Sequence, residues 1–220
     1  MENIKKNISK LQQNPISVIV RTKTFQNAQK ILKNTIENGF VFAEITLTIP
    51  NAFELIKETK KKYPQIMIGA GTVLNLEEAK KAVQSGANYL VSPIYNKEIL
   101  KWSLKEDKLY IPGVMTINEM YNVTKNGAKI FKLYPSTFLS PQTLKLIQQP
   151  FPQFKILATG GIDLNNIESY FKAGVLAVGI TGQLGGISQI VDEEEIKKLS
   201  IKYINIMKKI LKERGNYHIK

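Results

Sequence analysis

Eight short runs of apolar and β-branched residues recur along the chain, and each is followed by turn residues and then by an amphipathic helical pattern. The runs occupy residues 16–20, 41–46, 66–69, 89–91, 109–111, 129–133, 155–158 and 175–180. Helical periodicity fills residues 25–38, 52–62, 76–85, 97–106, 117–125, 142–148 and 167–173 between them. Eight strand–helix units within 220 residues predict an α/β fold, a (β/α)8 TIM barrel.

A doubly wound open sheet uses the same alternation of strands and helices and is the alternative architecture. The chain has no G-x-G-x-x-G opening, which favours the barrel. We expect residues 1–220 to form a single barrel domain, with an N-terminal helix over residues 1–14. Glycines at positions 39, 86, 127 and 174 follow helical patterns, as left-handed C-caps require. A last helix begins near Asp192, and residues 213–220 are expected to form a polar tail.

The near absence of Cys and His limits the chemistry available to the chain. It has no Cys and a single His, His218, which falls in the expected polar tail. Thiolate nucleophiles, Ser-His-Asp triads and metal sites built from Cys or several His are therefore excluded. We expect an enzyme without metal or cofactor, in which Lys, Glu, Asp, Tyr, Ser, Thr and the backbone do the chemistry.

The net charge of +13 comes mainly from Lys, because Arg21 and Arg214 are the only arginines among 31 basic residues. The lysines are spread over predicted helix surfaces, whereas base recognition and phosphate clamps favour Arg. We therefore expect solvated helix faces and no nucleic-acid partner. No apolar run approaches the roughly 18 residues that a membrane span needs, so we expect a cytoplasmic protein without a membrane partner.

Two ionisable residues interrupt strands that should be apolar on both faces. Glu44 lies in the second run and Lys132 in the sixth, each toward the C-terminal end of its strand, where the active sites of barrels are found. A buried ion pair is the structural alternative. The functional interpretation is a lysine whose apolar surroundings favour its neutral, nucleophilic amine, with a carboxylate that moves protons nearby. Such a pair points to Schiff-base chemistry.

Other residues near the expected C-terminal rim are candidates for ligand binding. Arg21 ends the first strand and could hold a carboxylate or orient Glu44. Small residues follow the third strand, at 69–72. Glycine-rich loops follow the seventh and eighth strands, where barrels of this class commonly bind phosphate through backbone N–H groups. The candidate phosphate residues are Gly160, Gly161, Gly179, Thr181 and Gly182.

Taken together, these motifs resemble the family of 2-keto-3-deoxy-6-phosphogluconate (KDPG) and 4-hydroxy-2-oxoglutarate (KHG) aldolases. The resemblance runs from about residue 15 to residue 184 and includes Arg21, the segments 44–48, 69–73, 91–93, 111–116 and 131–135, and Thr159-Gly160-Gly161. It implies that Lys132 is the Schiff-base lysine and Glu44 the general acid/base. It further implies that Arg21 and Thr72 hold the pyruvate moiety, that Pro93, Tyr134 and Thr159 line the pocket, and that the enzyme is a homotrimer.

Two positions depart from the family pattern. Some members have Arg where this chain has Thr48, and Arg21 is expected to supply the carboxylate contact instead. A Gly-Ser pair is usual in the eighth loop, where this chain has Thr181-Gly182. We expect a class I aldolase that cleaves KDPG to pyruvate and glyceraldehyde 3-phosphate, and also KHG to pyruvate and glyoxylate. The alternatives are an aldolase for the galactonate epimer or for an unphosphorylated 2-keto acid, and a catalytically silent phosphate-ligand or nucleic-acid-binding protein.

Overall fold

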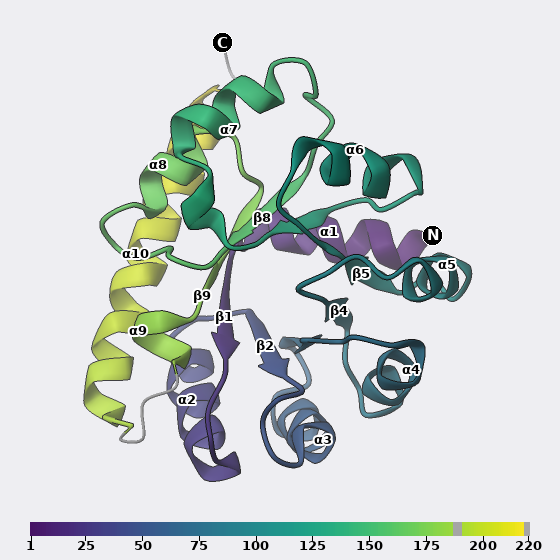
Figure 1. The fold of residues 1–220 in the computed structure, drawn as a ribbon. Coiled ribbons are helices and arrows are strands. Elements are labelled where there is room, and N and C mark those ends of the chain that lie inside the picture. The colour runs from purple at the N-terminus through teal and green to yellow at the C-terminus, as the bar shows by residue number, and fades with distance from the viewer. Residues whose placement is uncertain (187–190, 218–220) are drawn as a thin grey trace.

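The strands form one parallel sheet that curls into a nearly closed barrel, with helices around it (Figure 1). The computed structural model describes residues 1–186 and 191–217. The strand order is β5-β4-β3-β2-β1-β9-β8-β7-β6. The strands are β1 (Ile16–Val20), β2 (Phe42–Thr46), β3 (Met67–Gly71), β4 (Tyr89–Val91), β5 (Leu109–Ile111), β6 (Gly113–Val114), β7 (Phe131–Leu133), β8 (Ile156–Thr159) and β9 (Ala177–Ile180). The predicted TIM barrel is confirmed.

The described residues form nine strands where eight were predicted, because Pro112 divides the fifth one. β5 pairs with β4, while β6 pairs with β7, so the two pieces on either side of Pro112 face different neighbours. Proline has no backbone N–H to donate, but its carbonyl accepts from Lys132 N at 2.8 Å. The divided fifth strand therefore brings the two halves of the barrel together and fixes the backbone of Lys132.

Helices follow the strands where the periodicity predicted them. They are α2 (Phe25–Glu37), α3 (Ala52–Lys62), α4 (Leu76–Gln84), α5 (Lys97–Lys105), α6 (Ile117–Lys125), α7 (Pro141–Gln148) and α8 (Ile167–Lys172). Thr24, Asn75, Asn96, Thr116 and Ser140 cap five of these helices by accepting backbone N–H groups. The four glycines expected at C-caps all have positive φ, between 93° and 106°.

The chain ends differently from the prediction. Helix α10 (Glu193–Tyr217) continues through residues 213–217, which were expected to begin a polar tail. His218 lies outside the described residues. The sequence also gave no sign of two short elements, the 3-10 helix η1 (Ser136–Phe138) and α9 (Gly182–Gly185). No helix in the described ranges is long and apolar enough to cross a membrane.

The expected N-terminal helix is α1 (Glu2–Gln13), and it closes the N-terminal end of the barrel. Its apolar face, Ile4, Ile8 and Leu11, packs in one cluster with the residues that begin the strands, including Phe42, Met67, Tyr89 and Leu109. Asn7 donates to the carbonyl of Asn88 just before β4, and Asn3 donates to Asp107 just before β5. The opposite, C-terminal end is left for the site.

Truncating Leu11 in α1 tests this packing. Leu11→Ala should lower the free energy of unfolding by about 2–5 kcal/mol, because it leaves a cavity against the barrel floor. Urea unfolding followed by circular dichroism measures the change. Gln12→Ala, on the exposed face of the same helix, should stay within about 0.5 kcal/mol of the unmodified protein. Equal effects of the two substitutions would contradict a packed α1.

Candidate active site

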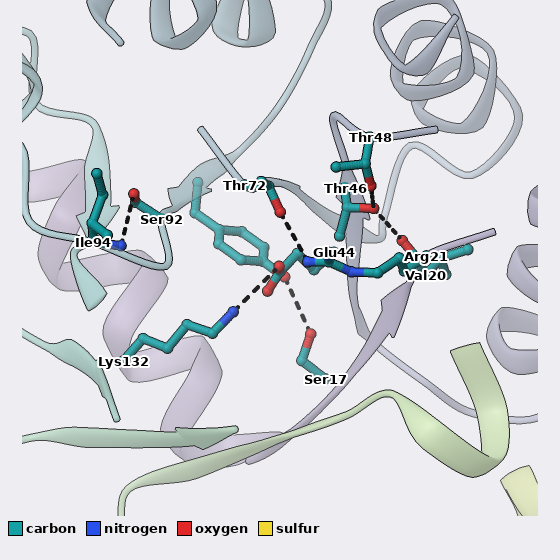
Figure 2. Close-up of polar contacts among 11 residues, drawn as sticks. Ser17, Val20, Arg21, Glu44, Thr46, Thr48, Thr72, Ser92, Ile94 and Lys132 are labelled. Carbon is teal, nitrogen blue, oxygen red and sulfur yellow. Dashed lines mark hydrogen bonds and ion pairs between the residues drawn. The ribbon is translucent and has the colours of Figure 1, made fainter. Parts of the chain in front are cut away.

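Two ionisable side chains meet inside the barrel. Glu44 of β2 is 1% exposed and Lys132 of β7 is 3% exposed. Three strands, β1, β9 and β8, separate β2 from β7 in the sheet, so the two side chains extend into the interior from different sides. Lys132 Nζ lies 3.8 Å from Glu44 Oε1 (Figure 2). The structure therefore brings together the two residues that the strand pattern singled out.

Glycines on β3 make room for this pair. A Cβ on Gly71 would collide with Glu44 Oε1, and a Cβ on Gly69 would collide with the ring of Tyr89. Both glycines lie in a strand whose neighbours fill the space that their missing side chains leave. Packing in the barrel interior beside Glu44 therefore requires the two glycines of this Gly-Ala-Gly segment, and a loop conformation does not.

The charges of Glu44 and Lys132 compensate each other in a largely apolar interior. Their separation of 3.8 Å is too long for a hydrogen bond, and Glu44 Oε1 has no hydrogen-bond partner among the described residues. Lys132 Nζ also lies 5.1 Å from the centroid of the Tyr134 ring. The amine and the carboxylate are close enough to act on the same ligand, and neither is held in a strong hydrogen bond.

A second polar group stands beside the pair, at the ends of β1 and β3. Arg21 Nη2 donates to Thr72 Oγ1 at 3.0 Å (Figure 2). Thr72 has a φ of 59°, an unusual value for a β-branched residue, and such backbone is typical of functional sites. The guanidinium is thereby held at the rim next to Glu44, with donors left for an anionic group.

Thr48 does not take part in that contact. Its hydroxyl pairs with Thr46 Oγ1 at 2.9 Å, and Thr46 Oγ1 donates to the carbonyl of Val20 at 3.0 Å. These hydroxyls tie the end of β2 to the end of β1 (Figure 2). Arg21 is therefore the cation that the structure places at this part of the rim.

The three predicted pocket residues lie at the C-terminal ends of three strands. Pro93 follows β4, and its backbone carbonyl packs against Gly113 of β6. Tyr134 follows β7 and is 39% exposed. Thr159 ends β8, and its buried Oγ1 has no hydrogen-bond partner in the described part of the chain. An unpaired buried hydroxyl is costly, so this atom is available to a ligand.

The glycine-rich loops lie at the same end of the barrel. Gly160 and Gly161 follow β8 with φ values of 89° and 80°, and Asn166 Nδ2 donates to the carbonyl of Gly161 at 2.7 Å. Thr181 precedes α9, and Gly182, the first residue of α9, is exposed. Arg21 N donates to the carbonyl of Gly185 at 2.8 Å, which joins the loop after β9 to the end of β1.

Gly179, also predicted from the sequence to belong to the phosphate site, lies in a strand and not in a loop. It lies within β9, in register with Ser17 and Thr159. A Cβ there would meet Ile19 and Thr159 inside the barrel. Gly179 is therefore a buried strand residue, and its small size leaves space for interior neighbours.

Comparison with known proteins identifies the family. The model of the family described as "KDPG and KHG aldolase" matches residues 7–205. The chain belongs to this aldolase family. It is an aldolase, a carbon–carbon lyase, as the sequence predicted.

Named relatives agree with this assignment. The chain is 33% identical over 148 residues to the 2-dehydro-3-deoxy-phosphogluconate aldolase of Pseudomonas aeruginosa, covering 66% of this chain and 67% of that one. It is 30% identical over 167 residues to the KHG/KDPG aldolase of Escherichia coli, with 75% and 78% covered. The KDPG aldolase of Legionella pneumophila, solved with pyruvate as a covalent carbinolamine intermediate, is 29% identical, with 91% and 95% covered and a TM-score of 0.71.

Two polar residues of the barrel interior are not among those predicted from the sequence. Tyr89 lies in a run that looks apolar, and Ser17 lies in the first strand. Their hydroxyls lie 3.3 Å apart in the barrel interior. Alternation along β1 was the available signal, because Ser17 is a polar residue within an otherwise apolar strand.

No group of three or more potential metal ligands occurs within residues 1–186 and 191–217.

Adding a methyl group at Gly71 should displace the Glu44 carboxylate from Lys132. We expect Gly71→Ala to reduce aldolase turnover by about 100-fold, because misplacing a group in an active site by about 1 Å has effects of this size. Pyruvate release measures turnover, and circular dichroism checks the fold. Gly215→Ala in α10, where a Cβ meets open space, should leave turnover unchanged. A fully active Gly71→Ala enzyme would show that the position of Glu44 is unimportant.

Proposed function

We propose that this aldolase cleaves KDPG to pyruvate and glyceraldehyde 3-phosphate by the class I mechanism, with Lys132 as the Schiff-base lysine. The observation that carries the proposal is the buried amine of Lys132, 3.8 Å from the buried Glu44 carboxylate at the barrel interior. A neutral lysine amine attacks ketones, and a carboxylate at this distance can exchange protons with the groups that form and break. The carbinolamine captured in the Legionella pneumophila enzyme supports the same chemistry.

The first half of the reaction forms the imine. The Lys132 amine attacks the C2 ketone, the resulting carbinolamine loses water, and Glu44 supplies and removes the protons. The positively charged iminium then accepts electrons from the neighbouring carbon–carbon bond. In this arrangement the protein needs no metal to stabilise the developing charge, because the iminium nitrogen is the electron acceptor.

The second half breaks the C3–C4 bond. Glu44 accepts the proton of the C4 hydroxyl, the C4 oxygen becomes the carbonyl oxygen of glyceraldehyde 3-phosphate, and the bonding electrons pass to the iminium to give an enamine. Glu44 returns a proton to C3, and water hydrolyses the imine to pyruvate and free Lys132. Glu44 therefore serves both as a base and as an acid.

Substrate binding is assigned to the rim. Arg21 and Thr72 hold the carboxylate of the keto acid, since their hydrogen bond fixes the guanidinium beside the pair. Pro93, Tyr134 and Thr159 line the pocket. The phosphate is assigned to the backbone of Gly160, Gly161 and Gly182 with the Thr181 hydroxyl, which lie in two adjacent loops at the C-terminal end. The proposal includes a homotrimer and a cytoplasmic location.

KHG is the second candidate substrate, with glyoxylate as its aldehyde product. It shares the 2-keto acid end that Lys132 and Arg21 would handle, and it has no phosphate. The galactonate epimer of KDPG and an unphosphorylated sugar acid are further alternatives. Thr181-Gly182 in the eighth loop is the feature on which the choice between phosphorylated and unphosphorylated substrates depends.

Borohydride reduction in the presence of pyruvate tests the Schiff base. We expect one adduct, located at Lys132 by peptide mapping, because reduction converts the imine to a stable secondary amine. Lys132→Ala should give no adduct, and Lys129→Ala, which replaces an exposed lysine three residues earlier in the sequence, should give the normal one. An adduct that persists in Lys132→Ala would refute the assignment.

Replacing the acid/base tests the other half of the pair. Glu44→Gln should slow cleavage by about 10²–10⁴-fold, the range typical of general acid–base groups. Steady-state pyruvate release measures the loss, and thermal unfolding checks the fold. Normal turnover of a folded Glu44→Gln enzyme would exclude Glu44 as the proton carrier.

Comparing a phosphorylated substrate, KDPG, with an unphosphorylated one, KHG, tests the proposed phosphate site. Thr181→Ala should raise KM for KDPG about tenfold and leave KM for KHG unchanged, since a lost hydrogen bond to a charged group has about this effect. Kinetics with both substrates on the same preparation supply the comparison. Equal changes for both substrates would mean that Thr181 does not contact phosphate.

A further inference from the structure

The side chain of Tyr89 crosses the inside of the barrel from β4 to β1. Glu44, Gly69 and Tyr89 are register partners on β2, β3 and β4, and register partners face the same side of a sheet. The outer half of the Tyr89 ring occupies the space that a Cβ of Gly69 would take. The Tyr89 hydroxyl then lies 3.3 Å from Ser17 Oγ on β1. The ring therefore passes β3 and β2 to reach β1.

This path places the Tyr89 hydroxyl on the side of Glu44 that faces the N-terminal end of the barrel. Ser17 is in register with Phe42, two residues before Glu44 on β2. The Tyr89 and Phe42 rings are in contact, with centroids 5.7 Å apart. The hydroxyl thus lies one layer nearer the N-terminal end of the barrel than the Glu44 carboxylate, whereas substrate enters from the C-terminal end.

The Tyr89 hydroxyl keeps its proton in this position. Burial raises the pKa of Tyr89 well above its ordinary value, and the negative charge of Glu44 raises it further. Ser17 can donate to the Tyr89 oxygen, which leaves the phenolic proton for an acceptor on the other side. The buried Glu44 Oε1 accepts no hydrogen bond from Tyr89 or from any other described residue in this structure, so it is free to be such an acceptor.

We propose that Tyr89, supported by Ser17, is a positioning residue that orients the Glu44 carboxylate and stabilises its charged form from the inner side of the barrel. The proposal rests on the acid/base role of Glu44 proposed above. Tyr89 and Ser17 touch neither substrate nor the reacting atoms, and they act through Glu44 alone. A hydrogen bond from the phenol would hold the carboxylate in an orientation that faces Lys132.

Few other groups face Glu44. Lys132 on β7 lies 3.8 Å away, and Arg21 at the end of β1 is held by Thr72. β3 presents Gly69 and Gly71, which carry no titratable side chain. The two cations lie toward the C-terminal end of the barrel, where substrate enters. The hydroxyls of Tyr89 and Ser17 are the polar groups on the opposite side of Glu44. Removing these hydroxyls should therefore change the behaviour of the Glu44 carboxylate in kinetic measurements.

Single-hydroxyl variants test the proposal because they keep the packing of the barrel. Tyr89→Phe should lower kcat for pyruvate release by about tenfold with KM unchanged, as expected for a hydrogen bond to a charged group. The acidic limb of the kcat/KM profile should move to higher pH, because a carboxylate that loses a donor ionises less readily. Ser17→Ala should act in the same direction and more weakly. The double variant should be no slower than Tyr89→Phe, because Ser17 acts through Tyr89.

Ser103→Ala is the matched control. Ser103 on α5 is as fully buried as Ser17, and its hydroxyl bonds to the carbonyl of Leu100 outside the barrel. This variant should lose stability without a change in kcat or in the pH profile. Tyr89→Phe with normal kcat and an unmoved acidic limb would overturn the proposal, as would additive losses in the double variant. If Glu44→Gln is also fully active, the acid/base role itself fails, and the two failures are thus distinguishable.

Discussion

The buried ion pair between Lys132 and Glu44 is the interaction on which the rest of the site depends. Two charges inside a barrel are tolerated only when each has a partner and the surroundings fit them closely. Two glycines make this close packing possible. Gly71 leaves the space that the Glu44 carboxylate fills, and Gly69 leaves the space that the Tyr89 ring fills. The requirement for small residues on β3 thus follows from the charge on β2.

Much of this arrangement could be predicted from the sequence. Glu44 and Lys132 stood out because parallel strands covered on both faces are expected to be apolar, and a charge there has a large energetic cost. The strand–helix recurrence predicted the barrel, and barrels bring the ends of all strands to one face. Pairing of the two residues then follows from the fold, even though 87 intervening positions separate them in the sequence.

Other features could not be read from the sequence, for physical reasons. Gly179 lies in a glycine-rich segment, and glycine is used both in loops and where interior neighbours need space, so its residue type does not distinguish the two. Tyr89 looks apolar within a strand, and its importance comes from a crossing of the barrel that depends on the register of four strands. The continuation of α10 to Tyr217 reflects the tolerance of helices for polar residues on a solvated face.

The divided fifth strand has a consequence for how the site is assembled. Strands β1–β5 carry Glu44 and Arg21, while β6–β9 carry Lys132 and Thr159. The two groups of strands meet where β1 pairs with β9 and again across Pro112, whose carbonyl holds the backbone of Lys132. Neither half of the chain contains both members of the ion pair. The candidate site is therefore a property of the closed barrel, and it is complete only when the chain has folded around its full circumference.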